Sequence, residues 1–485
     1  MTRAGGANTS LRDPRWIALF FAFGLAISIL MVARSQVAGD QLNHLGRGWH
    51  LAMEGRWVPF GPPATRGGAQ IGGLNALLVG LPLMAWEDHR APTAVVLLFH
   101  LVAYLLLDHL VRRALGPPER FLFALLYWLN PWRLFFSGFL WNPNYLLLAG
   151  AVHLWTAWRL RRRPRFWVSF LHVLALGLSM QIHVACLMLV IASLLLWWRR
   201  YLRLHLAGAA LAALVVAASL VPWALAVVAE PGFLPAGEGL PGRGLLTVHP
   251  MLKGFAHWLR FPGLAFGHAM TCLDFSRLGG PGLERLRPFL AVVKGIVLPL
   301  TLLLSAWCNW RLWRHRRRTW RAPIAPGAPE RVWLGGYVRW TLLATLATFA
   351  LSPTSISHWY VFPVFHAAVL PVVLAGGALL RTRRATAVLR TASAYAAIML
   401  LLAPAFAFGA PPYRCGPPRC KGNVYLMPAL RSEHPMFDRL GIRETCPLVT
   451  DDPEGWWPTA LEEEGVPWEP STYQEPYPEQ RPEPE

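Results

Sequence analysis

The sequence predicts an all-α protein that crosses a membrane many times, and three observations support this class. Of its 485 residues, 54% are hydrophobic and only 15% are charged, whereas about a quarter of the residues in soluble domains are charged. Apolar runs of roughly 20 residues, the length that crosses a bilayer, recur along most of the chain. Short basic loops separate these runs. We therefore expect one polytopic helical bundle rather than several soluble domains.

The positive charge of the chain is concentrated in those loops. The net charge is +20, but residues 1–410 contain 39 Lys and Arg against 12 Asp and Glu, while residues 411–485 contain 7 against 14. The basic loops read "VRRALGPPER", "RLRRRPR", "WWRRYLR", "RLWRHRRRTWRAP" and "RTRRATAVLR". Short cationic loops are typical of the cytoplasmic side of a membrane. The charge therefore indicates topology rather than nucleic-acid binding.

These loops divide the chain into about 11 crossings, and up to 13, with the N-terminus inside. The first span is retained, because no convincing small-residue cleavage site follows it. The expected spans are Trp16–Val32, Val95–Val111, Phe121–Leu140, Tyr145–Leu160, Phe166–Met180, Ile182–Trp198, Leu206–Ala229, Phe289–Trp307, Tyr337–Leu351, Tyr360–Leu380 and Val388–Phe408.

The apolar segment Ile71–Trp86 does not fit this series. It is short and contains Pro82, and a crossing here would place Arg112 and Arg113 outside. We therefore expect a re-entrant or interfacial segment that borders a cavity on the outer side.

The organisation that follows is a transmembrane domain over residues 1–410 and an outer tail over residues 411–485. The domain has two long outer loops, residues 34–70 and 230–288. The tail is rich in proline and ends in an acidic stretch that we expect to be disordered. Cys272, Cys415, Cys420 and Cys446 all fall outside, which favours two disulfides over a zinc site. Cys186 and Cys308 fall in or beside spans and predict free buried thiols.

Asp40 is the first residue that suggests chemistry, because it lies just past the first span in a region poor in acidic residues. A carboxylate at the rim of an apolar cavity has a raised pKa, which makes it a better proton acceptor near neutral pH. The alternative is that Asp40 only caps an interfacial helix that begins at "GDQL".

Further polar candidates fall at the same outer boundary. Asn142 and Asn144 flank Pro143, and they suit either amide contacts to a polar substrate or the start of a helix. Gln181 and His183 lie between two spans, and His358 and Tyr360 begin a late one. Arg133 lies inside a span and is a candidate functional charge unless its side chain snorkels. Asp108 and His109 lie near an inner end, where we expect them to cap the helix.

Four stretches, in this order, give the chain a resemblance to the GT-C membrane glycosyltransferases, and in particular to glycosyltransferase family 39, the protein-mannosyltransferase and aminoarabinose-transferase type. The stretches are "AGDQLNHLGRGWHLAMEGRWVP", "SGFLWNPNYLLLAGAVHLW", "ALGLSMQIHVACLMLV" and "HWYVFPVFHAAVLP". The resemblance covers about residues 15–380. Gln41 stands where the family usually has Glu, and Asn142 stands where other members have Asp.

The resemblance implies a reaction in which a sugar passes from a polyprenyl phosphate to an acceptor hydroxyl on a protein, lipid or glycan, at the outer face and with inversion. Asp40 would be the general base. The substrate-binding residues would be Gln41, Asn142, Asn144, Gln181, His183, Arg243, Lys253, Arg260, His358 and Tyr360, with Arg56 or Arg66 as further partners of the phosphate. Some family members hold a divalent metal, and we expect no tightly bound metal here, because acidic ligands are scarce.

The resemblance also implies a multi-pass protein of a bacterial cytoplasmic membrane, with its N-terminus inside and its C-terminus outside. Two other functions stay open. A transporter or flippase of a lipid-linked glycan would show internal repeats and midplane polar sites, and a polymerase or ligase of surface polysaccharide would share the lipid donor and the topology.

Overall fold

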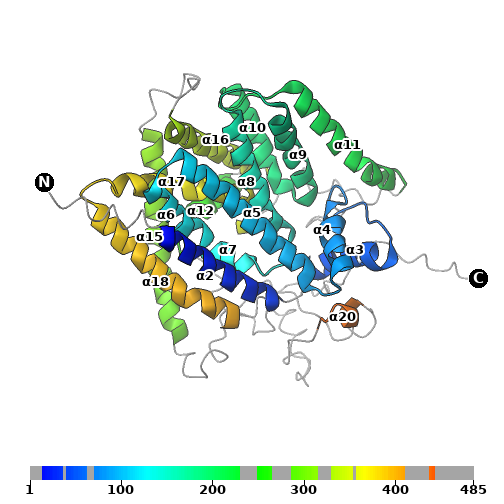
Figure 1. The fold of residues 1–485 in the computed structure, drawn as a ribbon, viewed down its shortest axis with the longest axis horizontal. Coiled ribbons are helices and arrows are strands. Elements are labelled where there is room, and N and C mark those ends of the chain that lie inside the picture. The colour runs from blue at the N-terminus through cyan, green and yellow to red at the C-terminus, as the bar shows by residue number, and fades with distance from the viewer. Residues whose placement is uncertain are drawn as a thin grey trace, which may run out of the picture.

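The computed structural model describes residues 14–35, 40–62, 70–229, 248–264, 286–314, 329–352, 357–409 and 436–442, and every regular element in these ranges is helical (Figure 1). This confirms the all-α prediction. The elements are α2 (Pro14–Ala33), α3 (Asp40–Glu54), α4 (Leu74–Ala85), α5 (Arg90–Ala114), α6 (Pro117–Phe123), the π-helical turn η1 (Ala124–Trp128), α7 (Pro131–Phe136), α8 (Asn142–Leu160), α9 (Phe166–Ile182), the short 3-10 helix η2 (Val184–Cys186), α10 (Leu187–Trp198), α11 (Leu206–Ala229), α12 (Val248–Arg260), α15 (Leu286–Arg314), α16 (Glu330–Ala350), the 3-10 helix η6 (His358–Val364), α17 (Phe365–Leu379), α18 (Ala385–Gly409) and α20 (Met436–Arg439).

The chain is a multi-pass membrane protein. Within the described ranges, six helical segments are long and apolar enough to cross a bilayer: Pro14–Ala33, Arg90–Ala114, Leu206–Ala229, Gly295–Arg314, His358–Leu379 and Ala385–Ala405. Three shorter apolar helices accompany them, Leu74–Ala85, Phe166–Ile182 and Val184–Trp198. The total of about 11 to 13 crossings stays a prediction.

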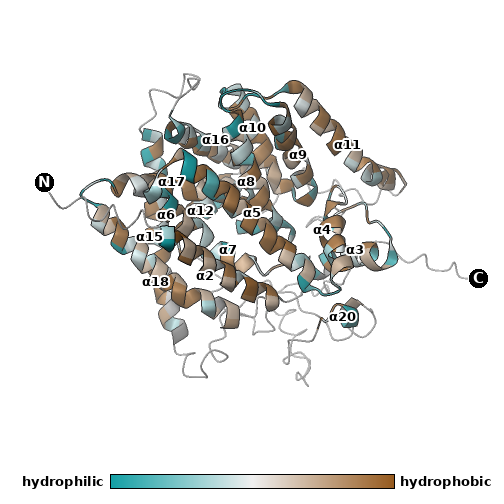
Figure 2. Cartoon of the chain, viewed as in Figure 1, coloured by the Kyte–Doolittle hydropathy of each residue, from teal (hydrophilic) through white to brown (hydrophobic). Residues whose placement is uncertain are grey.

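Apolar residues lie on the outside of the bundle as well as in its interior, and Figure 2 colours most of α11 as hydrophobic. On this helix Leu214, Leu225 and Val228 are 67%, 65% and 80% exposed. A helix that is apolar all round is typical of a membrane span. In a bilayer these exposed side chains would contact lipid.

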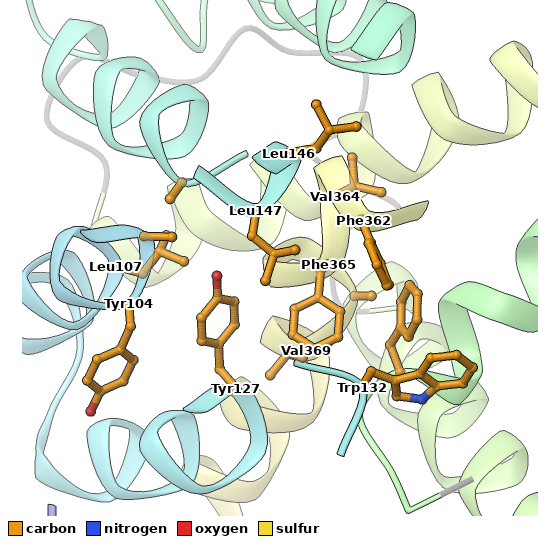
Figure 3. Packing of buried hydrophobic residues seen from close by; sticks show 14 of the residues in the cluster. Tyr104, Leu107, Tyr127, Trp132, Leu146, Leu147, Phe362, Val364, Phe365 and Val369 are labelled. Carbon is orange, nitrogen blue, oxygen red and sulfur yellow. The ribbon is translucent and has the colours of Figure 1, made fainter. Parts of the chain in front are cut away.

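The interior is packed with aromatic and branched side chains, several of which Figure 3 shows. Tyr127 packs edge-on against Phe365 at a centroid distance of 5.3 Å, and Tyr104 lies beside Trp128 at 4.8 Å. Such pairs stabilise a core beyond the area that they bury. Through them the broken segment formed by α6, η1 and α7 lies at the centre of the fold.

The expectation of one continuous span over Phe121–Leu140 is wrong. Pro131 has no backbone N–H to donate, and Asn130 caps the next helix by accepting from the backbone N–H of Trp132 at 3.0 Å, so the helix restarts here. The preceding π-helical turn at η1 widens the backbone. The segment therefore divides into α6, η1 and α7.

Arg133 is fully buried in α7 and does not snorkel. Its guanidinium donates to the Trp128 carbonyl oxygen at 2.5 Å and to Ser28 Oγ at 2.7 Å, and it lies over the Trp128 ring at 3.8 Å. These contacts join α2 to the π-helical turn. Arg133 has a structural role, because its hydrogen bonds within the described residues all go to the surrounding fold.

The end of the bundle that carries the basic loops is held by buried carboxylates. Glu119 is completely buried in α6 and pairs with Arg331 at 3.0 Å and with Arg381 at 2.5 Å. Asp108 accepts two bonds from Arg120, at 2.8 and 2.7 Å. The expectation that Asp108 caps a helix is therefore wrong, and this residue pairs α5 with α6 instead.

A chain of hydrogen bonds crosses the middle of the bundle and joins five helices. His366 Nε2 lies 2.9 Å from the Tyr337 hydroxyl, which lies 2.7 Å from His153 Nδ1. His153 Nε2 and His172 Nε2 both contact Ser193 Oγ, at 2.9 and 3.0 Å. A further bond at 2.7 Å joins His172 Nδ1 to the Thr156 hydroxyl. We call these six residues the histidine network.

The directions of these bonds follow from Ser193, whose hydroxyl donates to the Leu189 carbonyl oxygen at 2.9 Å. Ser193 Oγ must then accept from both neighbouring imidazoles, so each of them carries its proton on Nε2. The Tyr337 hydroxyl can then donate to His153 Nδ1 while it accepts from His366. His153 therefore bonds through both nitrogens in its neutral form, without an acidic partner.

Candidate functional site

The candidate site lies at the opposite end of the bundle from the basic loops, where α3 begins. Asp40 is the first residue of α3, and its side chain lies outside the described part of the structure. Gln41 follows it and is buried. His44 stands one helical turn later, about 6 Å along the axis. The amphipathic pattern of "DQLNHLGRGWH" explains why this face of α3 is buried.

His44 is a buried neutral imidazole next to the second candidate segment. Burial, and then the positive charges of Arg47 and His183, lower the pKa of His44 to about 3. Its Nδ1 atom accepts no bond within the described residues. Because His183 contributes to this lowering, the first turns of α3 lie in its neighbourhood.

His183 is oriented by its own backbone. Its Nδ1 atom accepts from the backbone N–H of Ala185 at 3.0 Å, so the proton of the neutral ring lies on Nε2. The ring meets Tyr360 edge-on at a centroid distance of 5.2 Å. Because His183 follows α9 and Tyr360 lies in η6, two of the four motif stretches meet at this contact.

A close helix contact holds η6 in this place. Gly150 of α8 leaves no room for a side chain, because a Cβ atom there would lie 2.0 Å from the Pro363 carbonyl oxygen and 2.9 Å from His366 Nδ1. The bare backbone of α8 therefore lets η6 pack closely against it, and His366 of the histidine network follows directly after η6.

Amide side chains line the neighbouring part of the site. Asn142 Nδ2 donates to Gln70 Oε1 and to the Ile182 carbonyl oxygen, both at 3.1 Å. Gln181 Nε2 donates to Ser219 Oγ at 2.7 Å. Gly72 has φ +83°, and a Cβ atom there would lie 2.6 Å from Gln181 Oε1. The glycines before α4 thus allow the close approach of these amides.

Asn144, unlike Asn142, forms hydrogen bonds that mainly hold the surrounding backbone in place. Its Nδ2 donates to the carbonyl oxygens of Phe136 and Phe139, at 3.1 and 2.9 Å, and its carbonyl oxygen lies 3.0 Å from His100 Nε2. These bonds fix the turn between α7 and α8. The Oδ1 atom is buried without a hydrogen-bond partner among the described residues and is the atom left for a ligand.

Asn75 is a further amide at this place, and it was not among the sequence candidates. It lies in the first turn of α4 and is completely buried, and neither its Nδ2 nor its Oδ1 atom has a hydrogen-bond partner within the described ranges. A buried amide without partners costs about 1–3 kcal/mol. α4 itself is only 12 residues long, about 18 Å, which agrees with the expected re-entrant or interfacial segment.

The third part of the site is the cationic face of α12. Lys253, His257 and Arg260 are spaced by four and three residues, so they share one face of the helix. Burial, and then Arg260 and Lys253, lower the pKa of His257 to about 4. Neither ring nitrogen of His257 has a hydrogen-bond partner in the described structure. Burial also lowers the pKa of Arg260.

η6 joins this cationic face to the rest of the site. His257 lies edge-on to His358 at 6.1 Å, and His358 lies 4.8 Å from the Trp132 ring. The guanidinium of Arg260 lies over the same Trp132 ring at 5.5 Å. A row of side chains thus runs from α3 through η6 to α12. Its members are His44, His183, Tyr360, His358, His257 and Arg260.

Several predicted residues fall outside the described ranges. They are Arg243, Arg66 and the four cysteines Cys272, Cys415, Cys420 and Cys446. Cys186 and Cys308 are free and buried, as predicted. Among the residues that the structure describes, no group of three or more His, Cys, Asp or Glu side chains could hold a metal ion.

Sequence reasoning missed His44, Asn75 and His257. A signal existed for two of them, because His44 stands four residues after Asp40, and His257 stands four after Lys253 and three before Arg260. Helical spacing alone predicts that such residues share a face. Asn75 carried no comparable signal, since it is one polar residue in an apolar run.

Comparison with known proteins adds two structures. No protein-family model and no curated protein matches the sequence. The solved structures of ArnT from Cupriavidus metallidurans, bound to undecaprenyl phosphate and in the apo state, are 18% and 15% identical to this chain, each with a TM-score of 0.48 over 81% of it. The match spans 65% and 74% of the two ArnT chains. At these values the similarity assigns neither an activity nor a substrate.

Proposed function

We propose that this chain is an integral-membrane glycosyltransferase of the GT-C type that moves a sugar from a polyprenyl phosphate to an acceptor hydroxyl on the outer face of the membrane. The observation that supports this best is the convergence of the four motif stretches on one end of the bundle. The contact of His183 with Tyr360 at 5.2 Å and the bond from Asn142 to the Ile182 carbonyl oxygen at 3.1 Å join three of them. His44 of the remaining stretch lies near enough to His183 for the two rings to interact electrostatically.

In the proposed reaction Asp40 accepts the proton of the acceptor hydroxyl. The hydroxyl oxygen forms a bond to the anomeric carbon while the bond from that carbon to the phosphate oxygen breaks, so the configuration inverts. A base placed for this step contributes about 10²–10⁴-fold to the rate. Neutral His44, one turn along α3, adds no positive charge that would favour the ionised carboxylate over the protonated form.

The leaving group is a lipid phosphate, and the cationic face of α12 is the part of the described site that fits it. Lys253 and Arg260 supply fixed positive charge, which stabilises the charge that develops on the phosphate oxygen. His257 lies between them with two unpartnered nitrogens, and its neutral ring supplies one donor. His358 and Trp132 form the wall that joins this region to His183.

The amides fit the sugar and the acceptor. Asn142, Gln181 and Asn75 carry neutral groups that both donate and accept, as hydroxyl groups do. The Nε2–H of His183 is a further donor whose direction is fixed by the bond from Ala185. The isoprenoid would lie against the apolar helices beside α4. One ArnT structure holds undecaprenyl phosphate, and sugars on this lipid are therefore the first donors to test.

The test is transfer of radiolabelled sugar from undecaprenyl phosphate in membranes that contain the wild-type chain or the Asp40→Asn variant. The amide has a similar shape but cannot accept the proton, and we expect activity to fall by about 10³-fold. Glu54→Gln is the matched control, because it makes the same change at the other end of α3, where Glu54 contacts His50 and Arg56. It should retain wild-type activity.

Equal transfer by wild type and Asp40→Asn would remove Asp40 as the base. A chain that transfers no sugar from any donor but moves lipid-linked glycans across vesicles would be a transporter instead.

A further inference from the structure

A short segment of the C-terminal tail is docked on the same end of the molecule as Asp40. The described residues 436–442, which include α20, lie below α3 in Figure 1. Met436 and Leu440 are completely buried and Ile442 is 5% exposed. All three belong to the main hydrophobic core. The apolar side chains therefore hold the segment in place, and we call residues 436–442 the strap.

Polar contacts fix the strap to the corner between α4 and α5 and to α3. Arg439 pairs with Glu87 at 2.5 Å, and its guanidinium lies over the ring of Trp49 in α3 at 5.3 Å. The backbone N–H of His89 donates to the Leu440 carbonyl oxygen at 3.1 Å. Segments that are distant in the sequence are thus joined beside the helix that begins with Asp40.

The side chain of His89 makes the most informative of these contacts. Its Nδ1 atom lies 3.0 Å from the Leu440 carbonyl oxygen, and its Nε2 atom lies 3.2 Å from the Ser35 carbonyl oxygen. A carbonyl oxygen can only accept. A neutral imidazole has one N–H and could make one of these bonds. Both bonds form together only when both nitrogens carry protons, so the imidazolium form is the one that can make both of them.

Several charged groups lie around His89. Asp88 Oδ1 lies 3.5 Å from Nδ1, while both Asp88 oxygens also bind Arg90. Glu87 is on the same corner and is paired with Arg439 of the strap. Arg34, which follows α2 directly, donates to the Phe408 carbonyl oxygen in α18. Asp438 of the strap is exposed.

We propose that protonated His89 is a positioning residue that ties the strap and the end of α2 to one corner of the site. Ser35 lies five residues before Asp40, so the contact with His89 holds the chain just ahead of α3. The contact of Arg439 with Trp49 holds α3 itself. The proposal rests on the proposed function only for its effect on catalysis. The docking of the strap can be measured without any substrate.

The first test is hydrogen–deuterium exchange of peptides that cover residues 436–442 and the amide of His89, with times corrected for the intrinsic exchange rate. Exchange is compared at about pH 6 and about pH 9, which lie below and above the ordinary imidazole pKa of about 6.5. The wild-type chain should lose protection of these amides at least tenfold at the higher pH, because one of the two bonds of His89 is lost.

His89→Gln should show the weaker protection at both pH values. His109 is an exposed histidine of α5, the helix that follows His89, and His109→Gln should behave as wild type. Protection that does not change with pH in the wild type, or that survives in His89→Gln, would overturn the proposal. This readout is independent of transfer and stays informative if the proposed function fails.

The second test compares chains that end after Ile442 and after Pro435. If the strap positions the site, the longer chain keeps wild-type kcat, and the shorter chain loses about tenfold in kcat with an unchanged KM for the donor. Far-ultraviolet circular dichroism and size exclusion check that both fold. Equal kcat in the two chains would contradict a role in catalysis while leaving the exchange result intact.

Discussion

The histidine network inside the bundle and two histidines of the candidate site, His44 and His257, differ in whether their ring nitrogens have partners. His153 and His172 each bond through both nitrogens, and His366 bonds to Tyr337. In the candidate site, both nitrogens of His257 and one of His44 lack hydrogen-bond partners among the described residues. A buried polar group that is satisfied stabilises the fold, whereas one without partners costs stability. The first set therefore holds helices together, and the second is available to a ligand.

The largest test of this comparison replaces one imidazole of each set by a ring of similar shape. His153→Phe removes the partner of both Tyr337 and Ser193, and we expect it to lower the free energy of unfolding by about 4 kcal/mol. His257→Phe removes two unpartnered nitrogens, and we expect it to raise stability by about 1 kcal/mol. Thermal unfolding in detergent measures both changes. The comparison fails if both variants lose stability equally.

The same pair separates stability from activity. Sugar transfer by His257→Phe should fall about tenfold or more although this variant is more stable. Stabilising a protein at a site that its activity needs commonly costs activity.

A smaller effect is expected from two tyrosines that differ only in their partners. Tyr337→Phe deletes the hydroxyl between His153 and His366, and we expect a loss of about 2 kcal/mol. Tyr145 is equally buried, but its hydroxyl has no partner within the described structure. Tyr145→Phe should change stability by less than about 0.5 kcal/mol. The difference between their thermal midpoints is the measurement, and equal losses would show that burial alone decides the cost.

The smallest effect is a pH dependence of stability from His44 and His257. Burial lowers the pKa of His44 to about 3 and that of His257 to about 4, against an ordinary value of 6.5. The unfolded chain then binds more protons than the folded one as pH falls below about 6.5. Stability is complete above that pH and declines towards acid, by about 1 kcal/mol per group between about pH 7.5 and about pH 6.

Denaturant midpoints at the two pH values would measure this slope, and His44→Gln should make it shallower by the share of one group. A slope that is unchanged in His44→Gln would mean that His44 is solvated or already paired with a charge.

Much of the fold was predictable, because apolar length and basic loops identify membrane helices directly. His183 and Tyr360, two of the motif residues that were predicted to share one boundary, contact each other, and their place at that boundary stays a prediction. The interruption before Pro131 was not predicted. The apolar run through Phe121–Leu140 is continuous, and hydropathy does not register a missing backbone N–H or a π-helical turn.

The side-chain partners were less predictable than the helices. Arg133 was a candidate functional charge, but its bonds to the Trp128 carbonyl oxygen and Ser28 depend on how α2 packs against η1. His153 and His366 each stand alone in an apolar run, and only the tertiary contact through Tyr337 makes them a network. Partners of this kind are properties of helix packing and leave no local pattern in the sequence.

The pairing of Glu119 with two arginines has a consequence for the synthesis of the chain. Its two arginine partners, Arg331 and Arg381, come 212 and 262 residues later. A ribosome that has delivered α6 to the membrane has not yet made either guanidinium. Until α16 and the end of α17 arrive, the carboxyl group of Glu119 must keep its proton or stay in contact with water, because a lone buried charge is too costly. The first half of the bundle therefore cannot close around Glu119 until the second half has been made. Packing at the end with the basic loops belongs to the last stage of assembly.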